Sequence, residues 1–503
     1  MHRAAIGAVV FALALSACSG DDDDGEATRA SETTTTVEPT PEVERPDGPA
    51  ADLSEELTGG NGFFIGSPYD YDWGAAGYVQ EEFVAAGTAT RYLTAGERTA
   101  DGRWTLEPGE TADYRTRVLV RRPERAEDFS GTVLVEWLNV SGGLDADPAV
   151  TYSREEIGRQ GHAWVGVSAQ HLGIEGGPVA VEVDAAGAEE FVGKGLKGID
   201  PERYGTLSHP GDAFSFDIYT QVARALRTGG PALGELEPEH LLSVGQSQSA
   251  AALVTYINGV QPLTRAFDGF FVQSRPAPGL VVPDIGEQAD LVQSFFGPPT
   301  ILRTDIGVPI MNVQAEIDLV AIFHSVEARQ PDTDTYRLWE VAGNAHADAR
   351  LVGEIGESGI DCGVPINDGP MHVVTKAALR HLTEWVVGGE PPPEAPRIEV
   401  TDTQPADIAR DADGIALGGL RTAPVDVPAE VLSGAPGPNP DIICLLAGST
   451  TPLPDARLTT LYPSRADYEE RYAAALDAAI EAGYVLEEDR GALEEYAHPE
   501  LVD

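Results

Sequence analysis

The chain has 503 residues, of which 42% are hydrophobic and 7% aromatic, enough to bury a sizeable core in one large domain or roughly two to three ordinary ones. It carries 33 Lys and Arg against 82 Asp and Glu, a formal net charge of −49. Such an acidic surface disfavours nucleic acids and anionic lipid headgroups as partners, and we interpret the excess as solvated surface.

The N-terminus is typical of a bacterial lipoprotein signal. A short basic start precedes residues 4–15, which are apolar but fewer than the about 20 residues that span a bilayer. Leu15-Ser16-Ala17-Cys18 resembles a lipobox, whose cysteine becomes the lipidated first residue of the mature chain. We therefore expect a signal peptide over residues 1–18 and a protein anchored through Cys18 to the outer face of the cell membrane. The alternative is an ordinary signal peptide cleaved near Ala17, which would give a secreted protein.

Residues 19–52 are rich in Asp, Glu, Thr and Pro and contain too few apolar residues to bury a core. They predict a disordered tether. Residues 53–503 are expected to form a single catalytic domain. Its two cysteines, Cys362 and Cys444, would lie in an exported domain, where a disulfide can persist. They either pair with each other or remain as two buried thiols.

The first part of the domain predicts strands. Residues 78–92 and 113–122 alternate polar with apolar side chains, which indicates antiparallel strands with one wet face. The sequences of residues 131–139 and 162–169 indicate more deeply buried strands, and a helix over 153–160 is predicted between them.

A loop-rich stretch to about residue 205 leads into a predicted helix over 213–228, for which Asp212 is a suitable N-cap. An apolar strand over 241–245 then runs through a sharp turn into a helix of small residues. After a further strand over 267–273, the Pro- and Gly-rich residues 274–307 are expected to form a lid over the site.

Strands over 308–314 and 336–341 follow, separated by a predicted helix over 319–329. An amphipathic helix over 376–387 precedes an expected C-terminal extension, residues 395–503, with helices over 468–483 and 486–496. The alternation of strands and helices from residue 131 to residue 387 predicts an α/β fold with a mostly parallel, doubly wound sheet. The two antiparallel strands would form its N-terminal edge.

The turn after strand 241–245 is the main functional motif. Gly245-Gln246-Ser247-Gln248-Ser249 matches a nucleophile elbow, with G-x-S-x-S where the usual pattern is G-x-S-x-G. An elbow needs small flanking residues so that the strand and the helix can pack closely around the serine, and Ser249 satisfies that need less well than glycine. The competing interpretation is a purely structural turn.

A serine nucleophile also needs a base and an acid that orients the base. We expect both at the carboxyl ends of other strands, because open parallel sheets bind their ligands there. Glu316 and Asp318 follow strand 308–314, and His346 follows strand 336–341. The order Ser, acid, His is that of the α/β-hydrolase fold. The usual spacing favours Asp318 as the acid, although it could instead cap the helix predicted to follow it, and Glu316 is the alternative.

An oxyanion requires backbone N–H donors. We expect one from Gln248, directly after the nucleophile, and one from Val140 or Ser141, where Gly142 and Gly143 let the backbone approach a substrate. The mechanism requires no cofactor, and no Cys/His cluster indicates a metal.

Four separated motifs resemble the bacterial alpha/beta hydrolase domain family of secreted serine esterases, within the α/β-hydrolase superfamily. They lie at residues 135–143, 209–212, 245–249 and 341–348. The resemblance extends from about residue 59 to 497 and includes Cys362, residues 367–370, residues 418–421 and Cys444. It implies the α/β-hydrolase fold and a Ser-acid-His hydrolase, and it implies no particular substrate.

We therefore predict a serine esterase that hydrolyses a small-molecule carboxylic ester through an acyl-enzyme. The apolar residues of the lid segment suggest a medium-sized, partly apolar acyl or alcohol group. One alternative is a peptidase, thioesterase or lactonase on the same triad, and another is a non-catalytic surface lipoprotein that only binds a ligand. The sequence does not indicate an oligomeric state.

Overall fold

The computed structural model describes residues 45–67, 69, 71–182, 190–403 and 405–502. The predicted signal peptide, Cys18 and residues 19–44 of the predicted tether lie outside the described residues. The packed domain begins slightly earlier than residue 53, because Ala51 is buried and its N–H donates to the carbonyl oxygen of Gln221 at 3.0 Å. Within the described part of the chain, no helix has the length and hydropathy needed to cross a membrane.

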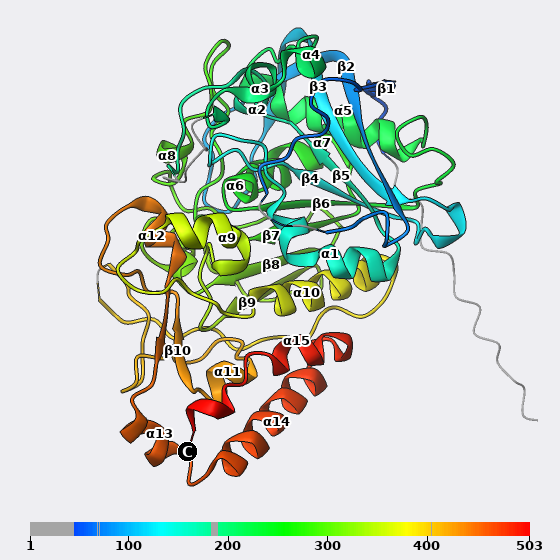
Figure 1. Cartoon of the computed structure of the whole chain (residues 1–503). Coiled ribbons are helices and arrows are strands. Elements are labelled where there is room, and N and C mark those ends of the chain that lie inside the picture. Colours follow the sequence, from blue (N-terminus) through cyan, green and yellow to red (C-terminus); the bar gives the residue numbers. More distant parts are fainter. Residues whose placement is uncertain (1–44, 68, 70, 183–189, 404, 503) are drawn as a thin grey trace, which may run out of the picture. The chain divides into compact units, whose positions relative to one another are not determined.

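A nine-stranded sheet forms the centre of the domain (Figure 1). Its strands are β1 (Asp52–Glu56), β2 (Tyr78–Thr94), β3 (Leu106–Pro123), β4 (Thr132–Trp137), β5 (Ala163–Val167), β6 (His240–Gln246), β7 (Gly269–Gln273), β8 (Ile310–Ala315) and β9 (Tyr336–Val341). Their order is β1-β2-β3-β5-β4-β6-β7-β8-β9. The strands from β1 to β3 are antiparallel, β3 pairs antiparallel with β5, and every later pairing is parallel.

The parallel strands are buried on both faces, which explains their continuous apolar sequences. Every residue of β4 is buried. Alternate side chains enter separate cores, because successive residues of a strand point to opposite faces. Val133 and Val135 belong to one hydrophobic cluster, whereas Leu134 and its neighbour Leu242 on β6 belong to another.

Helices cover each face of the sheet. On one face, α1 (Pro148–Gln160) and α10 (Met371–Val386) pack into the same cluster as Leu134. On the other face, α5 (Ser215–Arg227) and α6 (Gln248–Thr255) pack into the cluster of Val133. The domain therefore has the doubly wound α/β-hydrolase architecture that the sequence pattern predicted.

The connections contain shorter elements. Before the elbow these are α2 (His171–Glu175), α3 (Gly195–Ile199), α4 (Pro201–Tyr204) and the 3₁₀ turn η3 (Asp212–Phe214). After it come the π-helical turn η4 (Tyr256–Val260), α7 (Gln261–Thr264), α8 (Leu291–Ser294), the 3₁₀ turns η5 (Ile317–Leu319) and η6 (Ser325–Ala328), and α9 (Ala349–Gly359). The stretch that was expected to be loop-rich thus contains three short helices.

The C-terminal extension packs around a hydrophobic cluster of its own. It contains α11 (Ala423–Asp426), β10 (Glu430–Ser433), α12 (Ile442–Ala447), β11 (Ser449–Pro452), α13 (Asp455–Leu461), α14 (Arg465–Glu481) and α15 (Arg490–Glu494). Strands β10 and β11 form an antiparallel hairpin. Val373 of α10 belongs to the extension's cluster together with Tyr472 and Leu493, so the extension packs against α10.

The predicted helix over 319–329 is wrong. The chain there forms only η5 and η6, and the left-handed backbone of Ala321 (φ 51°) and His324 (φ 48°) interrupts any helix. Phe323 in this segment belongs instead to a hydrophobic cluster that also contains the disulfide cysteines. Tertiary burial therefore overrides the helical pattern in this segment.

Asp212 also differs from its expected role as an N-cap. It lies inside η3, and its carboxylate accepts hydrogen bonds from the backbone N–H groups of His171 at 2.7 Å and Ala289 at 2.8 Å. Asp212 thus joins the start of α2 to the segment 274–307. Within that segment, residues 274–280 are buried. The lid over residues 274–307 stays a prediction.

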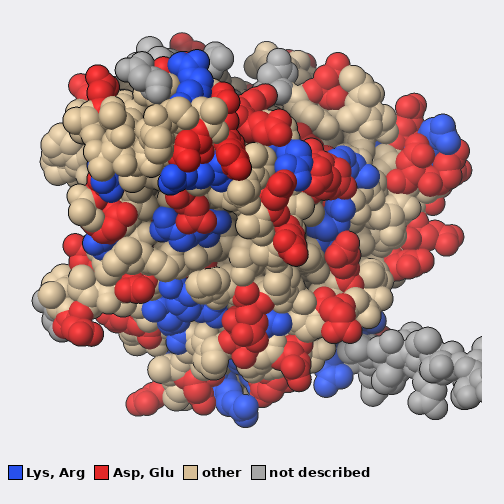
Figure 2. All heavy atoms as spheres, turned by 90° about the horizontal axis from the view of Figure 1, so that it is seen from below, with Lys and Arg blue, Asp and Glu red and all other residues tan. Residues whose placement is uncertain are grey.

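Acidic residues are distributed over the surface. On the face shown in Figure 2, Asp and Glu side chains lie interspersed with Lys and Arg side chains. Among the described residues, Arg490 forms ion pairs with Asp477 and Glu487, two carboxylates that are exposed. On this face, the arrangement supports the interpretation of the acidic excess as solvated surface.

Candidate active site

Ser247 occupies the sharp turn between β6 and α6. Its backbone has φ 61° and ψ −120°, a left-handed conformation that is uncommon for a residue with a side chain and that often marks a functional site. The turn is held in place because the Ser247 N–H donates to the carbonyl oxygen of Gln273, at the end of β7, at 3.0 Å. The serine remains 9% exposed, although the residues on either side are buried more deeply.

The two small residues flanking Ser247 serve different purposes. A Cβ atom at Gly245 would lie 3.0 Å from the backbone of Ser249, so any side chain there would force β6 and α6 slightly apart. The Ser249 hydroxyl donates to the carbonyl oxygen of Gln246 at 2.7 Å. Ser249 therefore does more than replace a glycine, because its hydroxyl also satisfies a polar group at the end of the strand.

Three side chains predicted at separate strand ends meet through two hydrogen bonds. His346 Nε2 lies 2.8 Å from Ser247 Oγ, and His346 Nδ1 lies 2.6 Å from Asp318 Oδ1. An ionised carboxylate only accepts hydrogen bonds, so Asp318 holds the proton on Nδ1 and leaves Nε2 free to accept the serine proton. The second oxygen of Asp318 accepts the N–H of Ala315 at 2.7 Å, which fixes the carboxylate. This arrangement can activate a serine nucleophile.

Glu316, the alternative acid, has other partners. Its buried carboxylate accepts the N–H of Gly343 at 3.0 Å and that of Gly434 at 3.1 Å, and it pairs with Arg410. Glu316 thus ties the loop that carries His346 to the C-terminal extension. Of the two acids considered from the sequence, Asp318 is the one bonded to His346.

Phe323 contacts the imidazole directly, and sequence reasoning missed it. The rings of Phe323 and His346 are stacked, with centroids 4.4 Å apart and planes inclined by 21°. On the other side of the loop, the Ala347 N–H donates to the carbonyl oxygen of Leu446 at 3.0 Å. Phe323 lay inside the wrongly predicted helix, and nothing in its local sequence indicated a partner 23 residues away.

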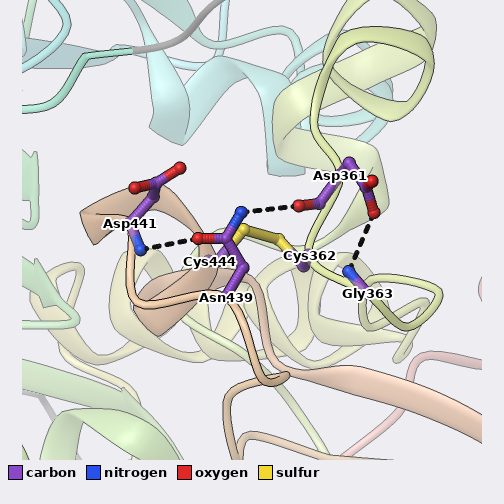
Figure 3. Close-up of a disulfide and its surroundings, with 6 residues drawn as sticks. All are labelled: Asp361, Cys362, Gly363, Asn439, Asp441 and Cys444. Carbon is purple, nitrogen blue, oxygen red and sulfur yellow. Dashed lines mark hydrogen bonds between the residues drawn. A yellow bond between two sulfur atoms is a disulfide. The ribbon is translucent and has the colours of Figure 1, made fainter.

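A disulfide joins Cys362 to Cys444 next to this loop, with the sulfur atoms 1.99 Å apart. Both cysteines belong to the hydrophobic cluster that contains Phe323 and Ala347. Figure 3 shows Asn439 beside the disulfide, where its Nδ2 donates to the carbonyl oxygen of Asp361 at 2.7 Å. The disulfide therefore links the segment after the His346 loop to the C-terminal extension.

The predicted oxyanion loop lies beside the elbow, and both of its candidate donors already have acceptors. The Ser141 N–H donates to Asn139 Oδ1 at 2.8 Å, whereas the Val140 N–H donates to Gln248 Oε1 at 3.3 Å. The longer bond is the weaker, so Val140 is the better placed of the two to release its donor to a substrate. The N–H of Gln248 lies in the first turn of α6, where a helix supplies no internal acceptor.

Gln170, which the sequence did not single out, orients Gln248. Its Oε1 accepts from Trp137 Nε1 at 3.0 Å and from Gln248 Nε2 at 2.6 Å. An indole nitrogen can only donate, so this bond fixes which amide atom of Gln170 is the oxygen. Gln248 must then present its own oxygen to Val140, and the four residues form one connected set of hydrogen bonds that converges on the Gln170 oxygen.

His209, the other histidine in a conspicuous motif, has a structural environment. Burial lowers its pKa to about 4, so the ring is neutral near pH 7. Its Nδ1 accepts the N–H of Gly211 at 3.2 Å and its Nε2 faces the carbonyl oxygen of Ala169 at 2.9 Å. His209 therefore stabilises the loop before α5 and does not contact Ser247.

Comparison with known proteins gives one extensive match. The model of a family described as "Alpha/beta hydrolase domain" matches residues 44–495. A comparison with curated proteins finds no match.

Several solved structures are similar at low sequence identity. XC6422 from Xanthomonas campestris, described as an a/b serine hydrolase without lid, is 14% identical over 50% of this chain and 83% of its own, with a TM-score of 0.25. The esterase domain of a Rhodothermus marinus protein is 13% identical over 53% of this chain and 91% of its own, with a TM-score of 0.24. A fungal esterase from Rhizomucor miehei is 12% identical over 60% of this chain and 85% of its own, with a TM-score of 0.29.

Proposed function

The chain belongs to the alpha/beta hydrolase domain family, and we propose that it is a serine hydrolase that cleaves carboxylic esters. In this proposal Ser247 is the nucleophile, His346 the general base and acid, and Asp318 the residue that orients His346. The observation that carries the proposal is the continuous hydrogen-bonded series from Asp318 through His346 to a serine with left-handed backbone. The buried position of Asp318 favours this role, because solvent cannot screen its charge.

The reaction would proceed by two acyl transfers. Ser247 Oγ attacks the ester carbonyl carbon while His346 Nε2 accepts its proton, and Asp318 stabilises the resulting imidazolium. The tetrahedral oxyanion accepts hydrogen bonds from the N–H groups of Gln248 and Val140, which requires the Val140 N–H to leave the Gln248 side chain. Collapse breaks the ester C–O bond, and His346 protonates the departing alkoxide. Water then attacks the acyl-enzyme with His346 again as base, releasing the carboxylic acid and regenerating Ser247.

Labelling with a fluorophosphonate tests the nucleophile. We expect a folded wild-type protein to be labelled stoichiometrically, and the label to disappear in Ser247→Ala. Absence of labelling in a folded wild-type protein would instead favour a non-catalytic binding protein. Rates on matched esters, thioesters, lactones and amides then test the bond type, and we expect the ester to have the highest kcat/KM. A faster thioester, lactone or amide would contradict the esterase assignment while leaving the triad intact.

We also propose that the protein is exported and anchored through lipid on Cys18. The proposal rests on the signal-like residues 1–18, and a disulfide between Cys362 and Cys444 is compatible with an oxidising compartment. Incorporation of a labelled fatty acid into wild type and its loss in Cys18→Ala would support the anchor. Equal release of both proteins into the medium would favour an ordinary secreted protein.

A further inference from the structure

A cavity of about 340 Å³ lies against the predicted oxyanion loop, and its volume falls at the lower end of the range for small-molecule sites. We call it the Val140 cavity. It is lined by Val140, by Gln170 and Leu172 at the start of α2, by residues 178–180, by Asp212, and by residues 288–292 of the segment 274–307. None of the triad residues lines this cavity, so the cavity is free to hold part of a substrate. Its position and the chemistry of its walls then indicate which part of the substrate it binds.

Two residues that line the cavity, Val140 and Gln170, form hydrogen bonds with the residue after the nucleophile. The Val140 N–H donates to the side chain of Gln248, which directly follows Ser247. Gln170 lines the cavity and bonds to the same Gln248 side chain. A group that entered the cavity would therefore lie beside Val140, one of the two donors proposed to hold the carbonyl oxygen.

The position of His346 indicates which side of the scissile bond the cavity would serve. The departing alkoxide must be close to His346 Nε2, because His346 protonates it. Among the described residues that line the cavity, none comes from residues 343–348 or is Phe323. The part of the substrate that points away from His346 is the acyl group. We propose, on the basis of the serine hydrolase assignment, that the Val140 cavity binds an uncharged, partly apolar acyl group of medium length.

The chemistry of the walls defines this class of acyl group. Apolar side chains of Val140, Leu172, Ala289 and Leu291 favour methylene groups. The charged residues lining the described cavity are Asp212 and Asp290, which would repel a carboxylate or phosphate on the acyl chain.

Gln170 is the polar group best placed to recognise an oxygen. Its Oε1 already accepts hydrogen bonds from Trp137 and Gln248, so the amide N–H₂ is what its side chain can offer to a ligand. An ether, keto or hydroxyl oxygen within the acyl chain fits that donor better than a charged group.

The wall formed by residues 288–292 is attached to the neighbouring loop. The Ala289 N–H donates to Asp212, and Gln288 Nε2 donates to the carbonyl oxygen of Gly176 at 3.1 Å. Gln288 Nε2 also lies 2.7 Å from His171 Nδ1. These bonds hold the wall against α2, so the cavity is preformed and its size sets the acyl length that it accepts.

The test compares two series of esters with wild-type protein. In the first, p-nitrophenyl acetate, butyrate, hexanoate and octanoate vary only the acyl group. We expect kcat/KM to rise about fourfold for each methylene that enters the cavity, and then to level off. In the second, acetate esters of alcohols of increasing length vary only the leaving group, and we expect no comparable rise. An acyl chain ending in a carboxylate should react more slowly than the uncharged chain of equal length.

Larger side chains on two different lining segments should narrow the cavity. In Ala180→Phe and in Val292→Phe we expect the hexanoate-to-acetate ratio of kcat/KM to fall about fifteenfold, which corresponds to the loss of two buried methylenes. Val281→Phe is the matched control, because Val281 lies in the same segment, is 40% exposed against 42% for Val292, and does not line the cavity. The control should keep the wild-type ratio, and thermal melts should show that all three variants are folded.

The outcomes separate this inference from the proposed function. Folded Ala180→Phe and Val292→Phe proteins that hydrolyse acetate with a wild-type acyl ratio would overturn the inference and leave the hydrolase proposal standing. A change confined to the alcohol series would overturn it as well, because it would assign the cavity to the leaving group. A wild-type protein that neither hydrolyses esters nor reacts with fluorophosphonate would overturn the proposed function itself and, with it, the acyl assignment.

Discussion

Replacing Asp318 by Asn tests the proposed mechanism most directly. The asparagine side chain would keep an oxygen for the N–H of Ala315 but would present an amide N–H₂ to His346 Nδ1. His346 would then carry its proton on Nε2, facing Ser247, and could no longer accept the serine proton. The substitution also removes the charge that stabilises the imidazolium. Two unit charges 2.6 Å apart interact by about 6 kcal/mol at an effective dielectric constant of about 20. That energy corresponds to about four orders of magnitude in kcat.

The assay is kcat for a saturating p-nitrophenyl ester, together with the rate of fluorophosphonate labelling. Glu316→Gln is the matched control, because it neutralises the other buried acid and keeps one amide oxygen, which can still accept the N–H of Gly343 in the His346 loop but then leaves the N–H of Gly434 without its acceptor. It should cost about 1–3 kcal/mol of stability, through the lost pair with Arg410, and reduce kcat less than about tenfold. An Asp318→Asn protein that kept more than about a tenth of wild-type kcat would refute the reasoning. An equal loss of kcat in folded Glu316→Gln would refute it too.

Three further predictions concern Phe323, the disulfide and Glu136, a buried residue of β4. Phe323→Leu should lower kcat several-fold and change KM little, because the His346 ring loses the side chain that stacks on it and becomes less ordered. Steady-state kinetics on one ester measure both constants. A change in KM alone would contradict this role of Phe323. Replacing Cys362 and Cys444 by Ser should lower the free energy of unfolding by about 4 kcal/mol, because the disulfide closes a loop of 82 residues. Urea titrations of the oxidised wild-type protein and of the variant measure this difference. Equal urea midpoints would contradict the prediction. Burial raises the pKa of Glu136 from 4.5 to about 8, so its contribution to stability is fully present below pH 4.5 and is lost as the pH rises through 8. Glu136→Gln should therefore weaken the fall in unfolding free energy over this interval, as measured by denaturant titration at each pH, whereas an unchanged slope would exclude Glu136 as its source.

Local sequence determined the elbow and the strand framework. Ser247 was identified because an apolar strand, a glycine and a run of small residues occur within a few positions of it. His346 was identified in the same way, from a glycine-containing turn directly after a strand. Backbone dihedrals and the burial of alternate side chains depend mainly on neighbouring residues, so such patterns are readable without a structure.

The choice between residues close to each other in sequence required the tertiary structure. Glu316 and Asp318 follow the same strand, and their roles differ because one faces Arg410 in the C-terminal extension and the other faces His346. In the same way, only the tertiary structure shows that the N–H of Val140, a candidate oxyanion donor, already donates to the side chain of Gln248.

By itself, then, the sequence determined the class of fold, the order of the catalytic motifs and the identity of Ser247 and His346 as candidates. Only the tertiary structure decided the acid partner, the stacking of Phe323 on His346, the orientation of Gln170 and the cavity beside Val140. The physical reason is the range of the interactions. A strand, a turn or an elbow is specified by residues a few positions apart, whereas these contacts join side chains from separate segments, and packing of the whole domain determines which of them meet.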